Sequence, residues 1–356
     1  MIESLLKPIY KNLLDSPCGG PSVNNGKGIW MNCNENPEGV SEKALEAMEK
    51  AIHNVNLYPE PTCIELKEKL AAKYGVRPEN IAVANGSSGI IDTLGTLFIC
   101  DGDETIFCQP TFMIYNDITV NNGGTAKILP LTKEMYFDVD AMAEAINEKT
   151  KMVMICNPNN PTGCMVPKEK LFNFLEKLPD NVIALIDEAY IDFAEETKSD
   201  CTAVPFINKK NVVVVRTFSK ISGLAGVRIG YAIANEKIIG LLNRRLMTFN
   251  VNKVALAGAC GLLDDIQYLD NSYKHNAEGR KYLSEELEKL GFKVYESQTN
   301  FIYCTVEGID VVKTNENLLA NDIHINMRPE QIRISIGNME QNKIFINTLK
   351  KSIVRL

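Results

Sequence analysis

The sequence is poor in the residues that build metal sites and disulfide frameworks. Only three histidines occur among its 356 residues, and His53, His275 and His324 have no spacing typical of metal ligands. The ten cysteines are scattered between Cys18 and Cys304 without a Cys-x-x-Cys pair. We therefore expect no metal centre, and we expect the cysteines to be reduced and largely buried.

Two nucleotide-binding motifs and any long apolar run are also missing. No G-x-G-x-x-G follows the first expected strand, and G-x-x-x-x-G-K-[ST] occurs nowhere, which argues against nicotinamide and nucleoside-triphosphate enzymes. No apolar run is long enough to cross a bilayer, and no basic region precedes an apolar stretch near the first residue. We expect a cytoplasmic protein without a membrane partner.

The chain has no excess of positive charge. Lysine and arginine number 38 against 45 acidic residues, and the resulting net charge of -7 argues against a nucleic-acid partner. Hydrophobic residues make up 45% and charged residues 23%, which is typical of a globular chain. At roughly 150 residues per domain, the length predicts about two domains.

The most informative stretch that is present runs from Thr217 to Tyr231. It places Lys220 between Ser219 and Ser222, and Arg228 follows eight positions later. Hydroxyls and a guanidinium can bind a phosphate dianion from several sides, and a lysine amine can form a Schiff base with an aldehyde. The alternative is a solvated lysine in a polar loop after a strand. This stretch alone leaves both interpretations open.

Two expected strand ends carry further polar residues. Residues 151–156 are apolar and run into a turn that contains Asn160, and residues 182–186 end at Asp187 with Tyr190 close behind. A carboxylate at such a point faces the crevice where open α/β sheets bind ligands, and beside a pyridine nitrogen it keeps that nitrogen protonated. An asparagine and a tyrosine can hydrogen-bond the ring's phenolic oxygen. Alone, Asp187 is equally typical of a helix cap and Asn160 of a turn, but their order and setting favour the ligand site.

This combination of motifs resembles the fold-type I pyridoxal-phosphate aminotransferases, and most of all the histidinol-phosphate aminotransferase group. The motifs are NPNNPTG at 157–163, DEAY at 187–190, TFSK at 217–220 and GVRIGY at 226–231, and the likeness extends from NENP at 34–37 through LYP at 57–59 to IRISIG at 332–337. The resemblance implies pyridoxal 5'-phosphate as cofactor. It also implies a small-molecule amino donor, a 2-oxo acid acceptor such as 2-oxoglutarate, and a homodimer.

The resemblance assigns the catalytic roles residue by residue. Lys220 is the lysine that binds the cofactor aldehyde covalently and then acts as general base, and Asp187 is the partner of the ring nitrogen. Asn160 and Tyr190 flank the phenolic oxygen. Ser219 and Arg228 hold the cofactor phosphate, with Thr217 as a weaker candidate. The backbone amides of Gly86, Ser87 and Ser88, at the start of an expected helix, complete the phosphate site.

The remaining assignments concern aromatic rings and the substrate. Phe112 matches a ring that stacks on the cofactor, and Tyr58 matches a tyrosine that reaches the cofactor phosphate of the neighbouring subunit, although both are also typical of core residues. Arg333 matches the arginine that binds the substrate carboxylate in the family. The alternative is a surface arginine, but the flanking isoleucines alternate with Arg333 and leave it on the opposite face of the strand, which favours the binding role. Asn36 is a second substrate-binding candidate.

The amino donor is not fixed by these motifs. Relatives of the histidinol-phosphate group carry a tyrosine and an arginine for the substrate phosphate where this chain has Cys18 and Asn326, with Arg328 as a substitute for the second. The donor is therefore histidinol-phosphate-like or aromatic. The alternatives are a decarboxylase of a phosphorylated amino acid, similar to threonine-phosphate decarboxylase, and a catalytically silent regulator. The regulator is disfavoured because no helix-turn-helix segment is appended.

The pattern of elements predicts an α/β fold. Strands and helices alternate over about residues 41–240, which predicts a mostly parallel sheet covered on both faces. Thr62 and Glu65 predict a capping box for a helix that ends at Gly75. A helical stretch over 251–290 precedes short strands at 293–296, 301–304 and 332–336. We expect a large cofactor-binding domain at 31–250, and a small domain at 1–30 and 251–356 that carries Arg333.

Overall fold

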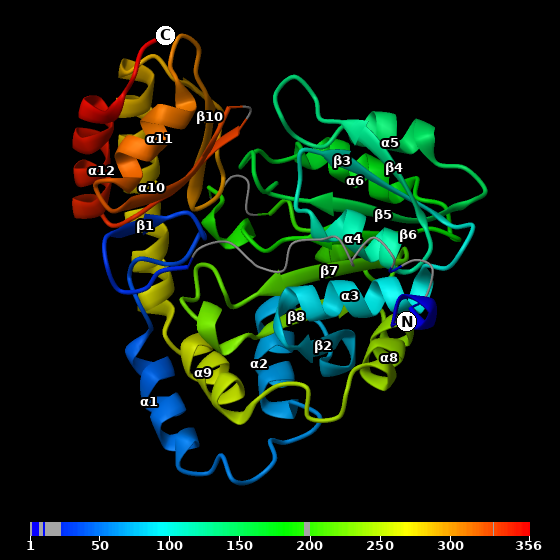
Figure 1. Cartoon of the computed structure of the whole chain (residues 1–356). Coiled ribbons are helices and arrows are strands. Elements are labelled where there is room, and N and C mark those ends of the chain that lie inside the picture. The colour runs from blue at the N-terminus through cyan, green and yellow to red at the C-terminus, as the bar shows by residue number, and fades with distance from the viewer. Residues whose placement is uncertain (1, 7–9, 11–22, 196–199, 330) are drawn as a thin grey trace.

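Two sheets, each with its own helices, organise the molecule (Figure 1). The computed structural model describes residues 2–6, 10, 23–195, 200–329 and 331–356. Cys18 therefore lies outside the described residues. The nine cysteines that are described are free, and most of them are buried, as expected.

The larger sheet has seven strands in the order β2-β8-β7-β6-β5-β3-β4. From β4 to β7 neighbouring strands are parallel, whereas β8 is antiparallel to both β7 and β2. Its central strands are apolar and buried along nearly their whole length, because helices cover both faces of a parallel sheet. Their bounds are β2 Ile81–Ala84, β3 Glu104–Gln109, β4 Thr125–Pro130, β5 Thr150–Cys156, β6 Ile183–Asp187, β7 Val212–Thr217 and β8 Gly230–Ala234.

Helices pack around this sheet and confirm the expected α/β fold class. The helix α3 lies against β7 and β8 with α4 and α8 beside it, and α5 with α6 forms a second group. The α-helices are α1 Glu42–Ile52, α2 Ile64–Tyr74, α3 Gly86–Phe98, α4 Ile114–Asn121, α5 Val139–Ala145, α6 Lys168–Glu176, α8 Glu236–Arg245 and α9 Lys253–Leu263. Short 3-10 helices are η1 Ile2–Leu5, η3 Pro78–Asn80, η4 Ile191–Phe193, η5 Val204–Phe206 and η6 Ala225–Val227.

The smaller sheet joins the two ends of the chain. Its order is β1-β11-β12-β10-β9, in which β1 is parallel to β11 and the other pairs are antiparallel. The sequence had not indicated β11, although its alternating apolar residues are typical of a strand with one buried face. The bounds are β1 Ile29–Met31, β9 Lys293–Val294, β10 Phe301–Thr305, β11 Ile323–Arg328 and β12 Gln331–Ser335, with helices α10 Ile266–Lys289, α11 Val311–Leu319 and α12 Met339–Ser352.

Two main hydrophobic cores correspond to the two sheets. The first extends through α9 as far as Leu262, whereas the second includes Met31 and resumes at Leu283. The long helix α10 contributes Leu269 to the first core and Leu283 to the second. We therefore propose that the two domains divide within α10, rather than at residue 250, because the apolar face of α9 packs on the larger domain.

The expected capping box at the start of α2 is wrong. The N-cap residue is Cys63 in a left-handed conformation, and its side chain makes no capping hydrogen bond. The Glu60 carboxylate instead accepts hydrogen bonds from the backbone N–H groups of Thr62 and Ile64. The helix does end at Gly75, whose φ of 64° is favourable for glycine, as the sequence predicted.

Candidate functional site

Lys220 and Asp187 lie at the same edge of the larger sheet. Asp187 ends β6, Lys220 follows the end of the parallel strand β7, and Asp187 pairs with Val215 in the ladder. Lys220 Nζ lies 3.3 Å from the carbonyl oxygen of Cys33 and 3.4 Å from that of Asn34. The segment that follows β1 of the smaller sheet therefore closes over the lysine.

Asp187 is a buried carboxylate whose negative charge is not balanced by a cationic side chain among the described residues. It is 3% exposed, and its two oxygens accept hydrogen bonds from the Tyr115 hydroxyl at 2.9 Å and the Ala189 N–H at 3.1 Å. Burial raises the pKa of Asp187 to about 6, against these two hydrogen bonds, which lower it. No cationic side chain forms an ion pair with Asp187 within the described ranges. The protonated ring nitrogen of pyridoxal phosphate, the cofactor that the resemblance implies, would supply the missing positive charge.

A candidate anion site, which we call the phosphate cradle, is formed by the residues that the sequence suggested: Gly86, Ser87, Ser88, Ser219 and Arg228. Gly86 begins α3 with a φ of 77°, and the N-cap residue before it makes no side-chain capping bond, so amides at the helix start are open to an anion. Arg228 packs so closely that a Cβ on Gly86 would lie 2.8 Å from its Nη2.

Hydroxyls complete the phosphate cradle. Arg228 Nη1 donates to Ser219 Oγ at 3.4 Å, and Thr217 Oγ1 donates to the same oxygen at 2.9 Å. Thr217 therefore contacts the phosphate cradle through Ser219, which agrees with its weaker assignment. Helix amides, hydroxyls and a guanidinium around one point are a donor set that fits a phosphate.

Tyr190 and Asn160 have different partners in the structure. The Tyr190 hydroxyl accepts a hydrogen bond from Asn34 Nδ2 at 3.0 Å, and the Tyr190 ring centroid lies 5.4 Å from Lys220 Nζ. Asn160 Oδ1 instead accepts from Arg333 Nη1 at 2.5 Å. Tyr190 thus lies next to Lys220, while Asn160 is hydrogen-bonded to Arg333.

Arg333 is held on the face of the smaller sheet that is turned away from its core. Its Nη2 donates to the Asn32 carbonyl oxygen at 2.6 Å, and its guanidinium lies 5.5 Å from the Phe301 ring centroid. Burial lowers the pKa of Arg333. Its Nε is buried and has no hydrogen-bond partner in the part of the chain that the structure describes. An anion bound there would stabilise both the buried charge and the unpaired N–H.

Asn326 lies directly opposite Arg333 in the β11–β12 ladder. Its Nδ2 donates to the Asn32 carbonyl oxygen at 2.7 Å, the same oxygen that accepts from Arg333. The position opposite Arg333 therefore offers an amide rather than a second cation. Cys18, the other departure from the histidinol-phosphate pattern, lies outside the described residues.

Three assigned residues have contrasting environments. Phe112 is 36% exposed and contacts the Tyr115 ring edge-on, with 6.1 Å between centroids. Tyr58 is 79% exposed and stacks on Phe249. The alternative that both rings belong to the core is therefore wrong. Asn36 Nδ2 is hydrogen-bonded to the Ile221 carbonyl and to two hydroxyls of α10, which favours a structural role over substrate binding.

Two residues near the site were missed from the sequence. Tyr115 orients Asp187, and Asn34 connects the Tyr190 hydroxyl to Ser335 through hydrogen bonds of 3.0 and 2.8 Å. Asn34 also has a φ of 56°, which asparagine tolerates better than most residues. Its place in the NENP motif was a usable signal, whereas nothing local distinguished Tyr115. No cluster of metal-binding side chains occurs among the described residues.

Comparison with known proteins identifies the family. Residues 26–349 match the sequence model of aminotransferase class I and II. The chain belongs to this family. Its cofactor is accordingly pyridoxal phosphate, and the aminotransferase is an enzyme whose substrates are small molecules. Three features fit this cofactor: the buried carboxylate of Asp187, the lysine beside it, and the phosphate cradle at the start of α3.

Known aminotransferases resemble this one over most of their length. It is 40% identical over 322 residues to histidinol-phosphate aminotransferase 2 of Carboxydothermus hydrogenoformans, covering 89% of each chain. The crystal structure of the histidinol-phosphate aminotransferase from Clostridium acetobutylicum matches with a TM-score of 0.83 and 27% identity, covering 91% of this chain and 98% of that one. The Sinorhizobium meliloti enzyme in complex with pyridoxal-5'-phosphate shares the fold, with a TM-score of 0.85 at 24% identity over 91% and 90% of the chains.

Proposed function

We propose that this aminotransferase takes the amino group of histidinol phosphate, or of a close analogue, and passes it to a 2-oxo acid such as 2-oxoglutarate. Relatives named histidinol-phosphate aminotransferase match this chain over about nine tenths of its length. The observation that supports the proposal is the buried Nε of Arg333, which has no hydrogen-bond partner among the described residues and which an anionic group of a substrate would satisfy. Histidinol phosphate and 2-oxo acids both have one.

The segment after β1 relates the anion site to the reacting lysine. The Asn32 carbonyl accepts from Arg333, while the next two carbonyls, of Cys33 and Asn34, accept from Lys220. A substrate bound through its anion at Arg333 would thus have its amino end directed towards Lys220. Such positioning converts an encounter of two molecules into a reaction within one site.

The proposed roles follow from these contacts. Bound pyridoxal phosphate supplies an aldehyde that takes up the amino group and a ring that withdraws electrons from the adjacent carbon. Asp187 would keep a positive charge on the ring nitrogen, and the phosphate cradle would fix the other end. Lys220 Nζ, when it is not bound to the cofactor, would accept the proton from the substrate carbon that bears the amino group. It would then return a proton to the cofactor's aldehyde carbon, on the other side of the amino nitrogen. Tyr190 and Asn160 would orient the phenolic oxygen.

A second candidate donor is an unphosphorylated aromatic amino acid. Asn326, opposite Arg333, provides no second cation, and a single guanidinium is matched to a carboxylate with one charge. A phosphate dianion would have to recruit Arg328, which is exposed and lies two residues further along β11. The decarboxylase alternative is no better supported, because the relatives are named as aminotransferases.

Steady-state kinetics on the purified holoenzyme would test the donor. Histidinol phosphate, phenylalanine, tyrosine and phosphothreonine would each be offered with 2-oxoglutarate, while glutamate formation and carbon dioxide release are followed. We expect kcat/KM for histidinol phosphate to exceed that for the aromatic amino acids by about 100-fold, the size expected from charge-assisted hydrogen bonds. A preference for phenylalanine or tyrosine would select the second candidate, and carbon dioxide release from phosphothreonine would contradict both.

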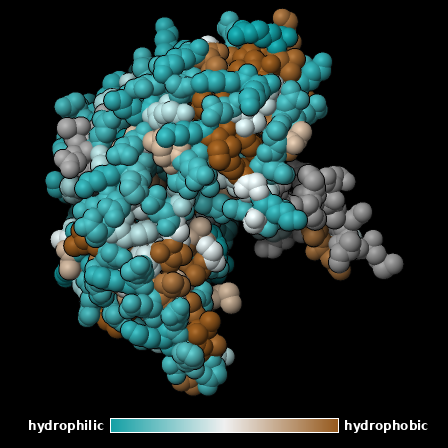
Figure 2. Space-filling model, turned by 90° about the vertical axis from the view of Figure 1, so that its left-hand side faces the viewer, coloured by the Kyte–Doolittle hydropathy of each residue, from teal (hydrophilic) through white to brown (hydrophobic). Residues whose placement is uncertain are grey.

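We also infer that the active form is a homodimer. Tyr58 is exposed together with Val55, Leu57 and Met247, each more than half exposed. Figure 2 shows apolar side chains over the lower part of one face, the end of the molecule at which α1 lies. Contiguous apolar surface of this kind is typical of protein interfaces. Sedimentation at micromolar concentration should give twice the chain mass, and a fully active monomer would refute the inference.

The cellular location remains a prediction. Within the described residues, no helix has the length and apolar character needed to cross a membrane. Action in the cytoplasm is proposed from composition, and fractionation of cells that express the protein would test it.

A further inference from the structure

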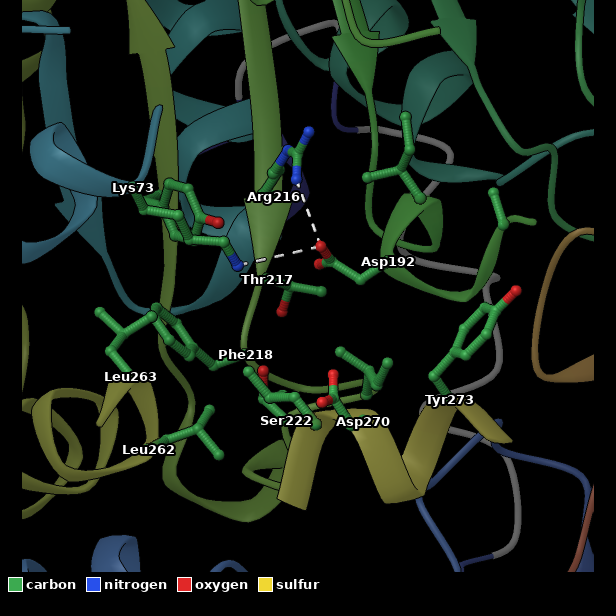
Figure 3. Close-up of a pocket in the computed structure, with 15 residues that line it drawn as sticks. Lys73, Asp192, Arg216, Thr217, Phe218, Ser222, Leu262, Leu263, Asp270 and Tyr273 are labelled. Carbon is green, nitrogen blue, oxygen red and sulfur yellow. Dashed lines mark hydrogen bonds and ion pairs between the residues drawn. The ribbon is translucent and has the colours of Figure 1, made fainter. Parts of the chain in front are cut away.

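A second cavity, of about 310 Å³, lies beside the cofactor site (Figure 3). It is bounded by α2, the end of β7, α9 and the amino-terminal part of α10. Thr217, Phe218, Ile221 and Ser222 line it, whereas Ser219 and Lys220 do not. Residues 217–222 therefore contribute some side chains to this cavity, while Ser219 and Lys220 belong to the candidate cofactor site.

One side of the cavity carries charges that are loosely paired. Asp192 lies between Lys73 and Arg216 in Figure 3, at 4.0 Å from Lys73 Nζ and 3.5 Å from Arg216 Nη1. Both distances exceed those of a good charge-assisted hydrogen bond, roughly 2.7–2.9 Å. By contrast, Arg216 Nη2 reaches Glu188 at 2.7 Å. Lys73 and Asp192 thus have capacity for a ligand, while Arg216 is already neutralised by Glu188.

A second carboxylate faces the same space. Asp270 lines the cavity from α10, close to Ser222 in Figure 3, and its carboxylate has no hydrogen bond or ion pair within the ranges that the structure describes. Because Arg216 is already paired with Glu188, the remaining charges of the lining are one cation, Lys73, and two carboxylates, those of Asp192 and Asp270. The cavity can therefore accept a positive group, and it also offers one cation to a negative group.

The part of the cavity beside α9 is apolar. Leu262 and Leu263 of α9, Leu269 of α10 and the ring of Phe218 line it. Leu262 and Phe218 are buried, and Figure 3 shows both leucines of α9 directed from one side. A ligand with charges at one end and a hydrocarbon group at the other would match both halves of the lining. The volume lies at the lower limit for small-molecule pockets, about 300 Å³, which favours a small ligand.

We propose that this cavity binds a free α-amino acid with an apolar side chain. Its ammonium group lies between Asp192 and Asp270, its carboxylate contacts Lys73, and its side chain packs against Leu262, Leu263 and Leu269. Because Ile191 and Ile221 of the lining are the neighbours of Tyr190 and Lys220, occupancy acts on the backbone that positions those two residues. The site is independent of the donor proposed above.

Calorimetry on a blocked holoenzyme would separate this cavity from the reacting site. Reduction with borohydride fixes the cofactor to its lysine, so amino acids cannot react there. We expect L-leucine, L-phenylalanine or L-methionine to bind the reduced enzyme once per chain, without changing the cofactor absorbance. 4-Methylpentanoate, which lacks the amine, and 3-methylbutylamine, which lacks the carboxylate, should each bind at least tenfold more weakly than leucine.

Variants would place the binding in the cavity. Lys73→Met and Asp270→Asn should each weaken amino-acid binding at least tenfold in the reduced enzyme. Glu278→Gln and Lys281→Met, which alter exposed residues of α10 outside the lining, serve as matched controls and should leave binding unchanged. Cofactor absorbance and the thermal midpoint would confirm that each variant is folded.

Three results would overturn the proposal. They are the absence of amino-acid binding to the reduced holoenzyme at millimolar concentration, equal binding by the amine or acid alone, and unchanged binding in both cavity variants. Failure of histidinol phosphate as a donor would leave this proposal intact, because the reduced enzyme does not turn over.

Discussion

The proposed cofactor end of the site and the proposed substrate end are built in different ways. At the cofactor end, Asp187 and Lys220 directly follow neighbouring strands of the larger sheet, and Arg228 bonds Ser219 nine positions away. At the substrate end, Arg333 is held by Asn32 and Asn160, which are 301 and 173 positions distant. The residues of the first end are brought together by the order of strands in one sheet, whereas those of the second come together only where the two domains meet.

The difference explains why the cofactor is easier to infer than the substrate. Parallel strands that end at one edge bring short motifs together, so the residues for the cofactor keep the same spacing wherever that sheet forms. The substrate end takes its shape from the smaller sheet, where a single residue opposite Arg333 changes the charge available. Variants at each end would show whether the two ends act separately.

The largest effect should come from Lys220→Ala at the cofactor end. Loss of the covalent link and of the general base should lower kcat by at least about 10⁴-fold, while the phosphate cradle retains some cofactor binding. Single-turnover measurements by cofactor absorbance would check this. Lys281→Ala is the control, and a Lys220 variant with activity within tenfold of the parent would contradict the assigned role.

At the substrate end, Arg333→Met should lower kcat/KM for the donor by about 100-fold, because charge-assisted hydrogen bonds contribute roughly 1.5–3 kcal/mol each. Cofactor affinity should change much less, since Arg333 reaches the proposed cofactor site only through its hydrogen bond to Asn160. Kinetics and cofactor titration would be compared with Arg245→Met, an exposed arginine of α8. Parallel losses of cofactor and donor binding would show that the two ends are not separable.

Asp187→Asn should have opposite effects on the apoprotein and the holoenzyme. Burial raises the carboxyl pKa from 3.8 to about 6, so the apoprotein loses stability as the pH rises from about 4 to about 6. The variant apoprotein should therefore be more stable at pH 8, by up to about 3 kcal/mol, with the difference vanishing below pH 4.

The holoenzyme of Asp187→Asn should be weaker in cofactor binding and turnover, because the amide cannot compensate a ring cation. Urea unfolding of both apoproteins at pH 4 and pH 8 would measure the stability difference. A variant less stable than the parent at pH 8 would mean that Asp187 is compensated without the cofactor.

The smallest effect should come from Tyr58→Phe. If Tyr58 reaches the phosphate cradle of the partner subunit, loss of its hydroxyl should weaken cofactor binding about tenfold, equivalent to one hydrogen bond to a charged group. Equilibrium dialysis would measure the affinity, with Tyr295→Phe as control. Unchanged affinity would remove Tyr58 from the cofactor site and leave it as an interface residue only.

Much of the larger domain was predictable because its signals are local. The strands β5 and β6 lie within one residue of the ranges expected for them, 151–156 and 182–186. The error at α2 arose because Thr62 and Glu65 had the spacing of a capping box, while Glu60, outside that pattern, made the bonds. Tyr115 and the Arg333 partners were not predictable, since their contacts join distant segments.

The amino-acid sequence was sufficient to identify the family and the cofactor and to propose Lys220 as the reacting lysine, because each inference depends on short motifs at the ends of buried strands. Three pairings became visible only in the folded chain: Asn34 with Tyr190, Asn160 with Arg333, and Asn326 opposite that arginine. The first two pairs are separated by more than 150 positions, and the third depends on the register of β11 and β12. Local sequence patterns predict neither long-range contacts nor the register of two strands.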